Sequence, residues 1–577
     1  MRRAFPFLLA LSAACSTSCV MHVVGPPAHA PPREPVVVAI VIDQFPAWLA
    51  EERVPKLPAD GFFARMRREG TWAKTMRYPY ALTDTAPGHA SLHTGRMPFE
   101  SHILVNSHPD DKTGVRTSFF RDASTKLVTP TGMLEEKGSS AKVLAVDTVA
   151  DRLRAQRPKA KILSFSLKDR AALLPAGKRP THALWFEPSK STFATSTAIS
   201  PVFPAWAAPI GDKAAIERAQ AETWTPLDAA FVAQNVGTMK DDAPGEGDLQ
   251  GLGTTFPHRA PNAWAFRATP SADRMVLDLA LAGVKATRDA KEPLLVLISL
   301  STSDVVGHTF GPSSWESWDH LRRLDASLAR FLDALEATTG PAAVVLSSDH
   351  GGVVMPEARP GCAKRDERDP YERPCAGGGR LLPDALRLEL IAEASAATGR
   401  SDVIAGVSDG YVFLTATGHG LDVAQRTLVD GAVRRVLTEK HRADVAEVYD
   451  VRDFAAKCPA ALGAARGIPE RARGGEDVLV LVCRSWAPNA GAGDYYVLPS
   501  HGSFWDGEVV PGKGTSHGTP YLYDRTVPLF VRGSGVEAGT VVSDAVDFSA
   551  YAALESAFLG LDPRVPNAIV KELSVRP

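Results

Sequence analysis

Residues 36–43 read VVVAIVID, seven consecutive apolar residues followed by Asp43. An apolar run of this length, rich in β-branched residues, is typical of a strand that is buried on both faces, as in a parallel sheet. Two later apolar runs, 294–300 and 342–346, also lead to aspartates. Because ligands of open α/β sheets bind at the carboxyl ends of the strands, the sequence predicts that these aspartates meet at one edge of the sheet.

Histidines accompany the two later aspartates. His308 lies four residues after Asp304, and His350 directly follows Asp349. Carboxylate oxygens and imidazole nitrogens are ligands that zinc prefers in proteins. The sequence therefore predicts a divalent-metal site with these side chains as ligands.

The rest of the chain is consistent with one large globular enzyme. Strand and helix patterns alternate along most of it, which predicts an α/β fold with a mainly parallel central sheet between layers of helices. The composition is ordinary, with 45% hydrophobic and 23% charged residues, and the formal net charge of −2 gives no reason to expect a nucleic acid partner. No later stretch is apolar for long enough to form a transmembrane segment.

The N-terminus has the form of an export signal. Arg2 and Arg3 precede a short apolar region that ends near Ala14, and a proline-rich stretch follows. We therefore expect residues 1–35 to be a signal peptide and tether, and residues 36–577 to be the catalytic domain. The exported protein would be periplasmic, or held at the outer membrane through a lipid on Cys15 or Cys19; the sequence leaves both forms open.

Two stretches interrupt the alternation of strands and helices. Residues 175–265 are rich in proline, alanine, tryptophan and threonine, and we expect an inserted cap over the site. Residues 353–381 are rich in glycine, proline and charge, which predicts a long loop. Four cysteines follow residue 35, and none of them has a Cys-x-x-Cys spacing, so disulfides are favoured over a cysteine zinc site in an oxidising compartment. Of three possible connectivities we favour neighbour pairing: Cys362–Cys375, which would staple the loop, and Cys458–Cys483.

A candidate nucleophile lies in residues 83–91, which read TDTAPGHAS. Pro87 suits the first turn of a helix, so Thr85 would stand at a helix N-terminus, where the helix dipole favours an alkoxide and binds phosphate. Alone, this pattern favours a threonine that merely caps a helix. A nearby zinc ion changes that reading, because it lowers the pKa of an oxygen bound to it by several units.

Taken together, these residues resemble the alkaline phosphatase superfamily. The order of metal ligands and nucleophile matches along almost the whole mature chain, and the chain is most similar to the phosphate-irrepressible (PafA-type) alkaline phosphatases, which use threonine. The matching positions are Asp43, Thr85, Asp304, His308, Asp349, His350 and His517, the last in the loop GKGTSHG at 512–518.

The resemblance implies two bound Zn²⁺ ions and a role for each residue. One zinc would be held by Asp304, His308 and His517, and the other by the remaining ligands together with the Thr85 oxygen. Asn106 fits the family's phosphate-contacting asparagine. Lys168 and Arg170 fit its Lys-x-Arg pair, with Lys168 standing where relatives with a third metal place magnesium.

Charge favours one substrate class within this superfamily. Two zinc ions together with Lys168 and Arg170 leave the site net positive, which suits a phosphate monoester dianion better than a diester monoanion. We therefore expect an exported phosphate monoester hydrolase in which Thr85 forms a phosphothreonine intermediate. Its partners would be small phosphate esters, and a monomer is expected.

Three other functions were weighed. A phosphodiesterase or nucleotide pyrophosphatase would share the metal ligands but would generally lack the Lys-x-Arg pair. A sulfatase would need Cys or Ser in a Cys/Ser-x-Pro-x-Arg signature, whereas this chain has Thr85-Ala86-Pro87-Gly88-His89. A non-catalytic exported protein that binds metal or phosphate would be favoured by a missing ligand, and none is missing.

Overall fold

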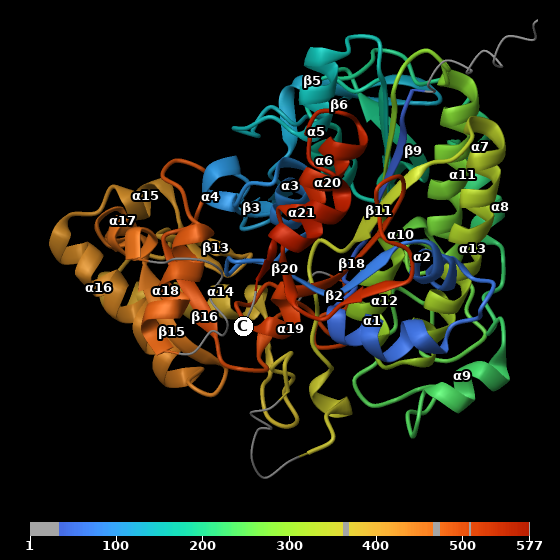
Figure 1. The fold of residues 1–577 in the computed structure, drawn as a ribbon. Coiled ribbons are helices and arrows are strands. Elements are labelled where there is room, and N and C mark those ends of the chain that lie inside the picture. Colours follow the sequence, from blue (N-terminus) through green and yellow to red (C-terminus); the bar gives the residue numbers. More distant parts are fainter. Residues whose placement is uncertain (1–33, 362–368, 465–473, 507–508, 576–577) are drawn as a thin grey trace, which may run out of the picture.

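The protein is described by a computed structural model that covers residues 34–361, 369–464, 474–506 and 509–575. Its centre is a sheet of 13 strands with helices on both faces (Figure 1). The expected α/β fold is therefore confirmed. The stretch 1–33, which contains most of the expected signal peptide and tether, lies outside the described residues.

The middle of the sheet is parallel. Strand β1 (Val36–Ile42) lies between β10 (Leu294–Leu300) and β11 (Ala343–Ser347). Next to β10 come β7 (Lys161–Ser166) and then β8 (His182–Glu187), both parallel. All seven residues of β1 and of β10 are buried, which agrees with the continuous apolar pattern of these segments.

Antiparallel pairs extend the sheet at both edges. They were not expected, since the sequence pattern predicted a mainly parallel sheet. On one side the sheet continues through β18 (Thr526–Arg532), β2 (Thr71–Arg77), β20 (Ala545–Asp547) and β21 (Ser574–Val575), with β19 (Thr540–Val542) also on β2. Of these strands, β19 and β20 pair parallel with β2. On the other side it continues through β9 (Thr192–Ser196), β5 (Arg121–Thr129) and β6 (Gly132–Ser139).

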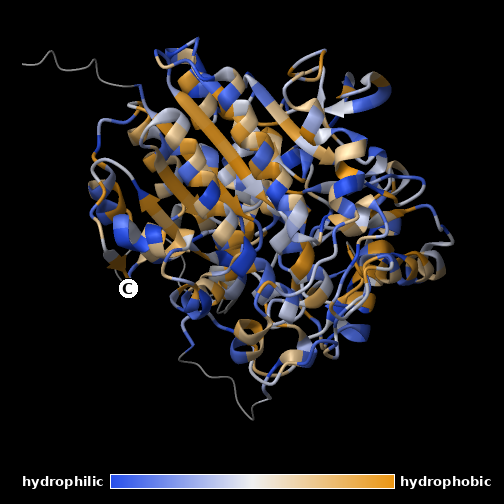
Figure 2. Cartoon of the chain, turned by 90° about the vertical axis from the view of Figure 1, so that its right-hand side faces the viewer, coloured by the Kyte–Doolittle hydropathy of each residue, from blue (hydrophilic) through white to orange (hydrophobic). Residues whose placement is uncertain are grey.

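Alternate residues of β1 belong to two separate cores. Val38 and Ile40 join the core that also contains residues of helices α11 (Pro270–Thr287) and α13 (Trp315–Thr339). Val37 and Ala39 face the opposite core, which contains residues of α5 (Val149–Gln156) and α20 (Ala550–Phe558). The hydrophobic strands accordingly run through the middle of the molecule (Figure 2). Among the described helices, none is both long and apolar enough to cross a membrane.

A separate lobe follows the central part of the chain, and sequence reasoning missed it. It is built on a four-stranded antiparallel sheet and lies beside the main body, as the orange segments of Figure 1 show. Two longer helices of the lobe pack against this small sheet. The elements are β13 (Ile404–Ser408), β14 (Tyr411–Leu414), β16 (Tyr495–Pro499), β15 (Val445–Asp450), α14 (Pro383–Thr398) and α16 (Val423–Arg434).

The expected disulfide Cys458–Cys483 is confirmed, and it links helices α17 (Phe454–Ala464) and α18 (Gly474–Arg484) of the lobe. Cys362 lies outside the described residues, so the pairing Cys362–Cys375 stays a prediction.

The stretch 175–265 does not form one insertion, because it supplies strands β8 and β9 to the central sheet. Only the part after β9 is left for the expected cap. That part holds the short helices α7 (Ala208–Gly211), α8 (Lys213–Gln220), α9 (Ala229–Asn235) and α10 (Ala263–Phe266).

Candidate metal centre and nucleophile

The expected metal ligands converge at the carboxyl end of the parallel strands. Asp43 directly follows β1, and Asp304 lies on α12 (Thr302–Phe310), which follows β10. Three sets of possible metal ligands form there. Within each set the ligand atoms lie within 4.8 Å of one another, and every residue is buried. These sets are Asp304, His308 and His517; Asp43, Asp304 and His350; and Asp84, His350 and His517.

The first set follows from helix geometry and one loop. Asp304 and His308 are four residues apart on α12, and their Oδ1 and Nε2 atoms are 3.1 Å apart. The His517 loop brings its Nε2 within 3.5 Å of the same Asp304 oxygen. The Nδ1 atom of His308 contacts the Thr515 carbonyl oxygen at 2.8 Å, which leaves Nε2 facing the carboxylate.

In the second set, Asp43 follows β1, Asp304 lies on α12, and His350 follows β11 next to Asp349, which is not in the set. His350 Nε2 lies 3.3 Å from Asp43 Oδ1 and 3.6 Å from Asp349 Oδ2. Burial alone would lower the pKa of His350, but the charges of Asp349 and Asp43 raise it to about 10.

The donor set fits a divalent cation. Oδ1 of Asp43, Oδ2 of Asp349 and Nε2 of His350 are buried without a hydrogen bond among the described residues. Buried carboxylates are normally neutralised by a paired cation or a metal ion. Lys168 supplies one positive charge to this group, and the remaining negative charge, with its nitrogen and oxygen ligands, suits zinc.

Thr85 occupies the helix N-terminus that the sequence predicted. It is the first residue of α3 (Thr85–Thr94), and the Asp84 carboxylate accepts a hydrogen bond from its backbone N–H at 2.8 Å. Its side chain is buried, and Lys168 Nζ lies 3.2 Å from its Oγ1. The hydroxyl therefore stands at the positive end of a helix dipole and beside a lysine ammonium.

Lys168 and Arg170 come from the start of helix α6 (Asp169–Ala176). Lys168 precedes α6, and its Nζ lies 2.6 Å from Asp43 Oδ2 and 2.7 Å from Asp304 Oδ2. Burial alone would lower the pKa of Lys168, but Asp304 and Asp43 raise it above the ordinary lysine value. Burial alone would raise the pKa of Asp84, but the charges of His517, His350 and Arg170 lower it.

Asn106 is held in place by three contacts. Its Oδ1 accepts from the Ala86 backbone N–H at 2.8 Å, and its Nδ2 donates to Asp84 Oδ1 at 2.6 Å. Its own backbone N–H donates to Asp409 Oδ2 of the lobe at 2.9 Å. The Asn106 amide is thus hydrogen-bonded to the residues on either side of Thr85 at the start of α3.

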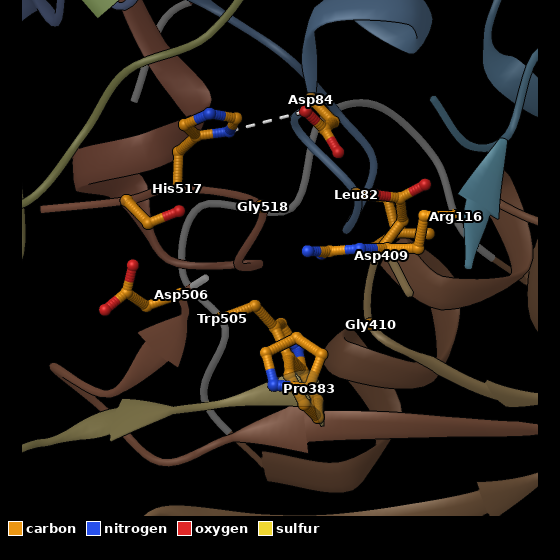
Figure 3. Close-up of a pocket in the computed structure, with 11 residues that line it drawn as sticks. Leu82, Asp84, Arg116, Pro383, Asp409, Gly410, Trp505, Asp506, His517 and Gly518 are labelled. Atoms are coloured by element: carbon orange, nitrogen blue, oxygen red, sulfur yellow. Dashed lines mark ion pairs between the residues drawn. The ribbon is translucent and has the colours of Figure 1, made fainter. Parts of the chain in front are cut away.

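A pocket opens beside His517, between the main body and the lobe (Figure 3). Asp84 and His517 both line it and point toward each other, with His517 Nδ1 3.7 Å from Asp84 Oδ1. The other walls come from segments far apart in the sequence: Leu82, Arg116, Pro383, Asp409, Gly410, Trp505, Asp506, Ser516 and Gly518.

Sequence reasoning missed three residues near the metal ligands. Asp84 could have been found, because an aspartate before a helix start is a standard N-cap. Gln44, whose Nε2 donates to Asp304 Oδ1 at 3.2 Å, and Arg116, which lines the pocket, carry no local sequence signal. Their place depends on how distant segments pack.

Comparison with known proteins agrees with this arrangement. The family model of type I phosphodiesterase / nucleotide pyrophosphatase matches residues 37–371, more than half of the chain. Alkaline phosphatase PhoV of Synechococcus elongatus is 31% identical over 336 residues, which cover 56% of this chain and 60% of that protein. Alkaline phosphatase PafA of Elizabethkingia meningoseptica is 27% identical over 539 residues, which cover 89% of each.

The fold matches a solved structure over nearly the whole chain. The crystal structure of wild-type alkaline phosphatase PafA has a TM-score of 0.73 and 25% sequence identity to this chain. The match covers 92% of this chain and 96% of that one, so it extends through the lobe as well as the central sheet.

Proposed function

Because the chain belongs to the type I phosphodiesterase / nucleotide pyrophosphatase family, within the alkaline phosphatase superfamily, we propose that it is an exported, zinc-dependent phosphate monoester hydrolase. The observation that carries this proposal is the position of Lys168 Nζ, 3.2 Å from Thr85 Oγ1. That ammonium adds a fixed positive charge where phosphorus would be attacked. Two relatives that match 89% and 88% of the chain are named alkaline phosphatases.

The protein would bind two zinc ions. Asp304, His308 and His517, which form one of the three sets, would hold one ion. Asp43, Asp349 and His350, which lie together beyond the ends of β1 and β11, would hold the other with the Thr85 oxygen. When bound, the ions would lower the pKa of the nucleophile and stabilise charge on the leaving oxygen.

The chain's own residues would carry out two in-line displacements. Thr85 Oγ1, having lost its proton, attacks phosphorus, and the bond to the ester oxygen breaks as phosphothreonine forms. A water molecule then attacks the same phosphorus and the Thr85 oxygen leaves, so that one ester and one water give one alcohol and one phosphate. Lys168, Arg170 and Asn106 hold the non-bridging oxygens during both steps.

A phosphodiesterase or nucleotide pyrophosphatase is the second candidate, because the matching family model carries that description. It would use the same ligands and Thr85. The charge near Thr85 favours the monoester, since Lys168 and Arg170 can meet the second negative charge that a diester lacks.

The test compares rates for an aryl phosphate and the matching bis-aryl diester with zinc-loaded protein. We expect the monoester to have the higher kcat/KM. Thr85→Ala should abolish nearly all turnover and keep most of the bound zinc, because Thr85 is one ligand among several. Preference for the diester would favour the second candidate, and full turnover by Thr85→Ala would refute the nucleophile.

The organisation of the whole chain is part of the proposal. Residues 1–35 would direct export to the periplasm or outer membrane, and residues 36–577 would form the catalytic domain. Mass determination of the secreted protein would reveal both the cleavage site and any lipid on Cys15 or Cys19.

A further inference from the structure

The amide of Asn106 can have only one orientation. The Ala86 backbone N–H is an obligatory donor and makes a 2.8 Å contact with one end of the amide. Oδ1 of Asp84 accepts from the Thr85 backbone N–H, so it is an acceptor, and it makes a 2.6 Å contact with the other end. The first end must therefore be the carbonyl oxygen, and the second end must be the NH₂ group.

A single oxygen of Asp84 makes these contacts. Its Oδ1 accepts from both the Thr85 N–H at 2.8 Å and Asn106 Nδ2 at 2.6 Å, and it lies 3.7 Å from His517 Nδ1. In Figure 3 the second Asp84 oxygen lies on the side away from His517. One carboxylate oxygen thus contacts the Thr85 backbone, the Asn106 amide and His517.

This arrangement leaves one donor for a substrate. An amide NH₂ group has two hydrogens, and Asp84 takes one of them. Among the described residues, no other acceptor contacts Asn106 Nδ2. The buried amide can therefore offer its second hydrogen to a phosphoryl oxygen only in the direction that Asp84 fixes.

We propose that Asp84 is a positioning residue, which aims the second Nδ2 hydrogen of Asn106 at the transferred phosphoryl group while it caps the Thr85 helix. This inference rests on the proposed function, because it requires a phosphoryl group at Thr85. Asp84 itself does not touch the reacting atoms.

Two substitutions separate geometry from charge. Asp84→Asn keeps an oxygen at the Oδ1 position, so it can still accept from Thr85 and Asn106, and we expect kcat to stay within about tenfold of wild type. Asp84→Ala removes that acceptor, and we expect kcat to fall by roughly 10–100-fold, with a smaller change in KM. Equal losses in the two variants would overturn the positioning role.

A double-mutant cycle with Asn106 tests whether Asp84 acts through the amide. We expect Asp84→Ala to cost at least about tenfold less in the Asn106→Ala background than in the wild-type background. Multiplicative losses would mean that Asp84 acts by another route. Zinc content is measured for each variant, and loss of zinc on Asp84→Ala would instead make Asp84 a metal ligand with His350 and His517.

The cycle is run with whichever aryl ester, mono- or diester, the wild type hydrolyses faster. A wild-type preference for the diester would refute the proposed function and still leave the coupling between Asp84 and Asn106 measurable. Absence of coupling with a monoester-preferring enzyme would refute only the role of Asp84.

Discussion

Replacing Lys168 and Arg170 together by alanine should remove much of the preference for monoesters. Lys168 Nζ is 3.2 Å from Thr85 Oγ1, so its charge lies next to any phosphorus attached there. Charge-assisted hydrogen bonds are worth roughly 1.5–3 kcal/mol each. Losing two of them should lower kcat/KM for a monoester dianion by on the order of 10²–10⁴-fold.

A diester has one negative charge fewer and should lose much less, about 10–10²-fold if the energy is halved. The assay is kcat/KM for matched aryl mono- and diesters, per zinc-loaded enzyme. The control is Lys213→Ala/Arg218→Ala, which removes the same charge from the exposed face of α8 and should change neither rate. Equal losses on both esters would show that Lys168 and Arg170 do not recognise the second charge.

Three further predictions concern stability and metal binding. Burial raises the pKa of Asp325 to about 6 from 3.8, so the stability that it contributes is complete below pH 3.8 and is lost as pH rises through 6. Asp325→Asn can still accept a hydrogen bond from the Phe63 N–H, so it should raise the free energy of unfolding. Urea titrations should show a gain that grows between pH 4 and 6 and levels off at about 1–3 kcal/mol. The double variant Cys458→Ser/Cys483→Ser should lower the free energy of unfolding by about 2–4 kcal/mol. An unchanged urea midpoint would contradict a structural role for this disulfide. His517→Ala should weaken zinc retention against a chelator, because His517 belongs to two of the ligand sets; retention equal to wild type would remove it from the centre.

The sequence was sufficient to predict the centre of the fold. The apolar run at 36–42 can be satisfied only where both faces are covered, and the structure buries every residue of β1. Asp43 then lies at the carboxyl edge by connectivity alone. Thr85 was placed at a helix start from the turn chemistry around Pro87, and that helix begins at Thr85. These are local signals, so one sequence was enough to read them.

The lobe could not be predicted in the same way. Helices α14 and α16 alternate with short strands, which is also the pattern of a βα unit in a parallel sheet. Whether a strand joins the central sheet depends on its long-range partner, and β15 pairs with β16 rather than with the main sheet. One local signal was available: Asp409 and Gly410, with φ of 46° and 77°, form the tight turn between β13 and β14.

The same turn explains why the lobe matters to the site. Asp409 Oδ2 accepts from the backbone N–H groups of Asn106 and Ser107, at 2.9 Å each, while Asp84 and Ala86 hold the Asn106 amide from the main body. The position of that amide is therefore set by both parts of the protein at once. A carboxylate in a turn of the lobe fixes its backbone, and a carboxylate at the start of the nucleophile helix fixes its side chain. Because positioning of donors within a fraction of an ångström governs transition-state stabilisation, the lobe would contribute to catalysis at the proposed site by holding Asn106 in place.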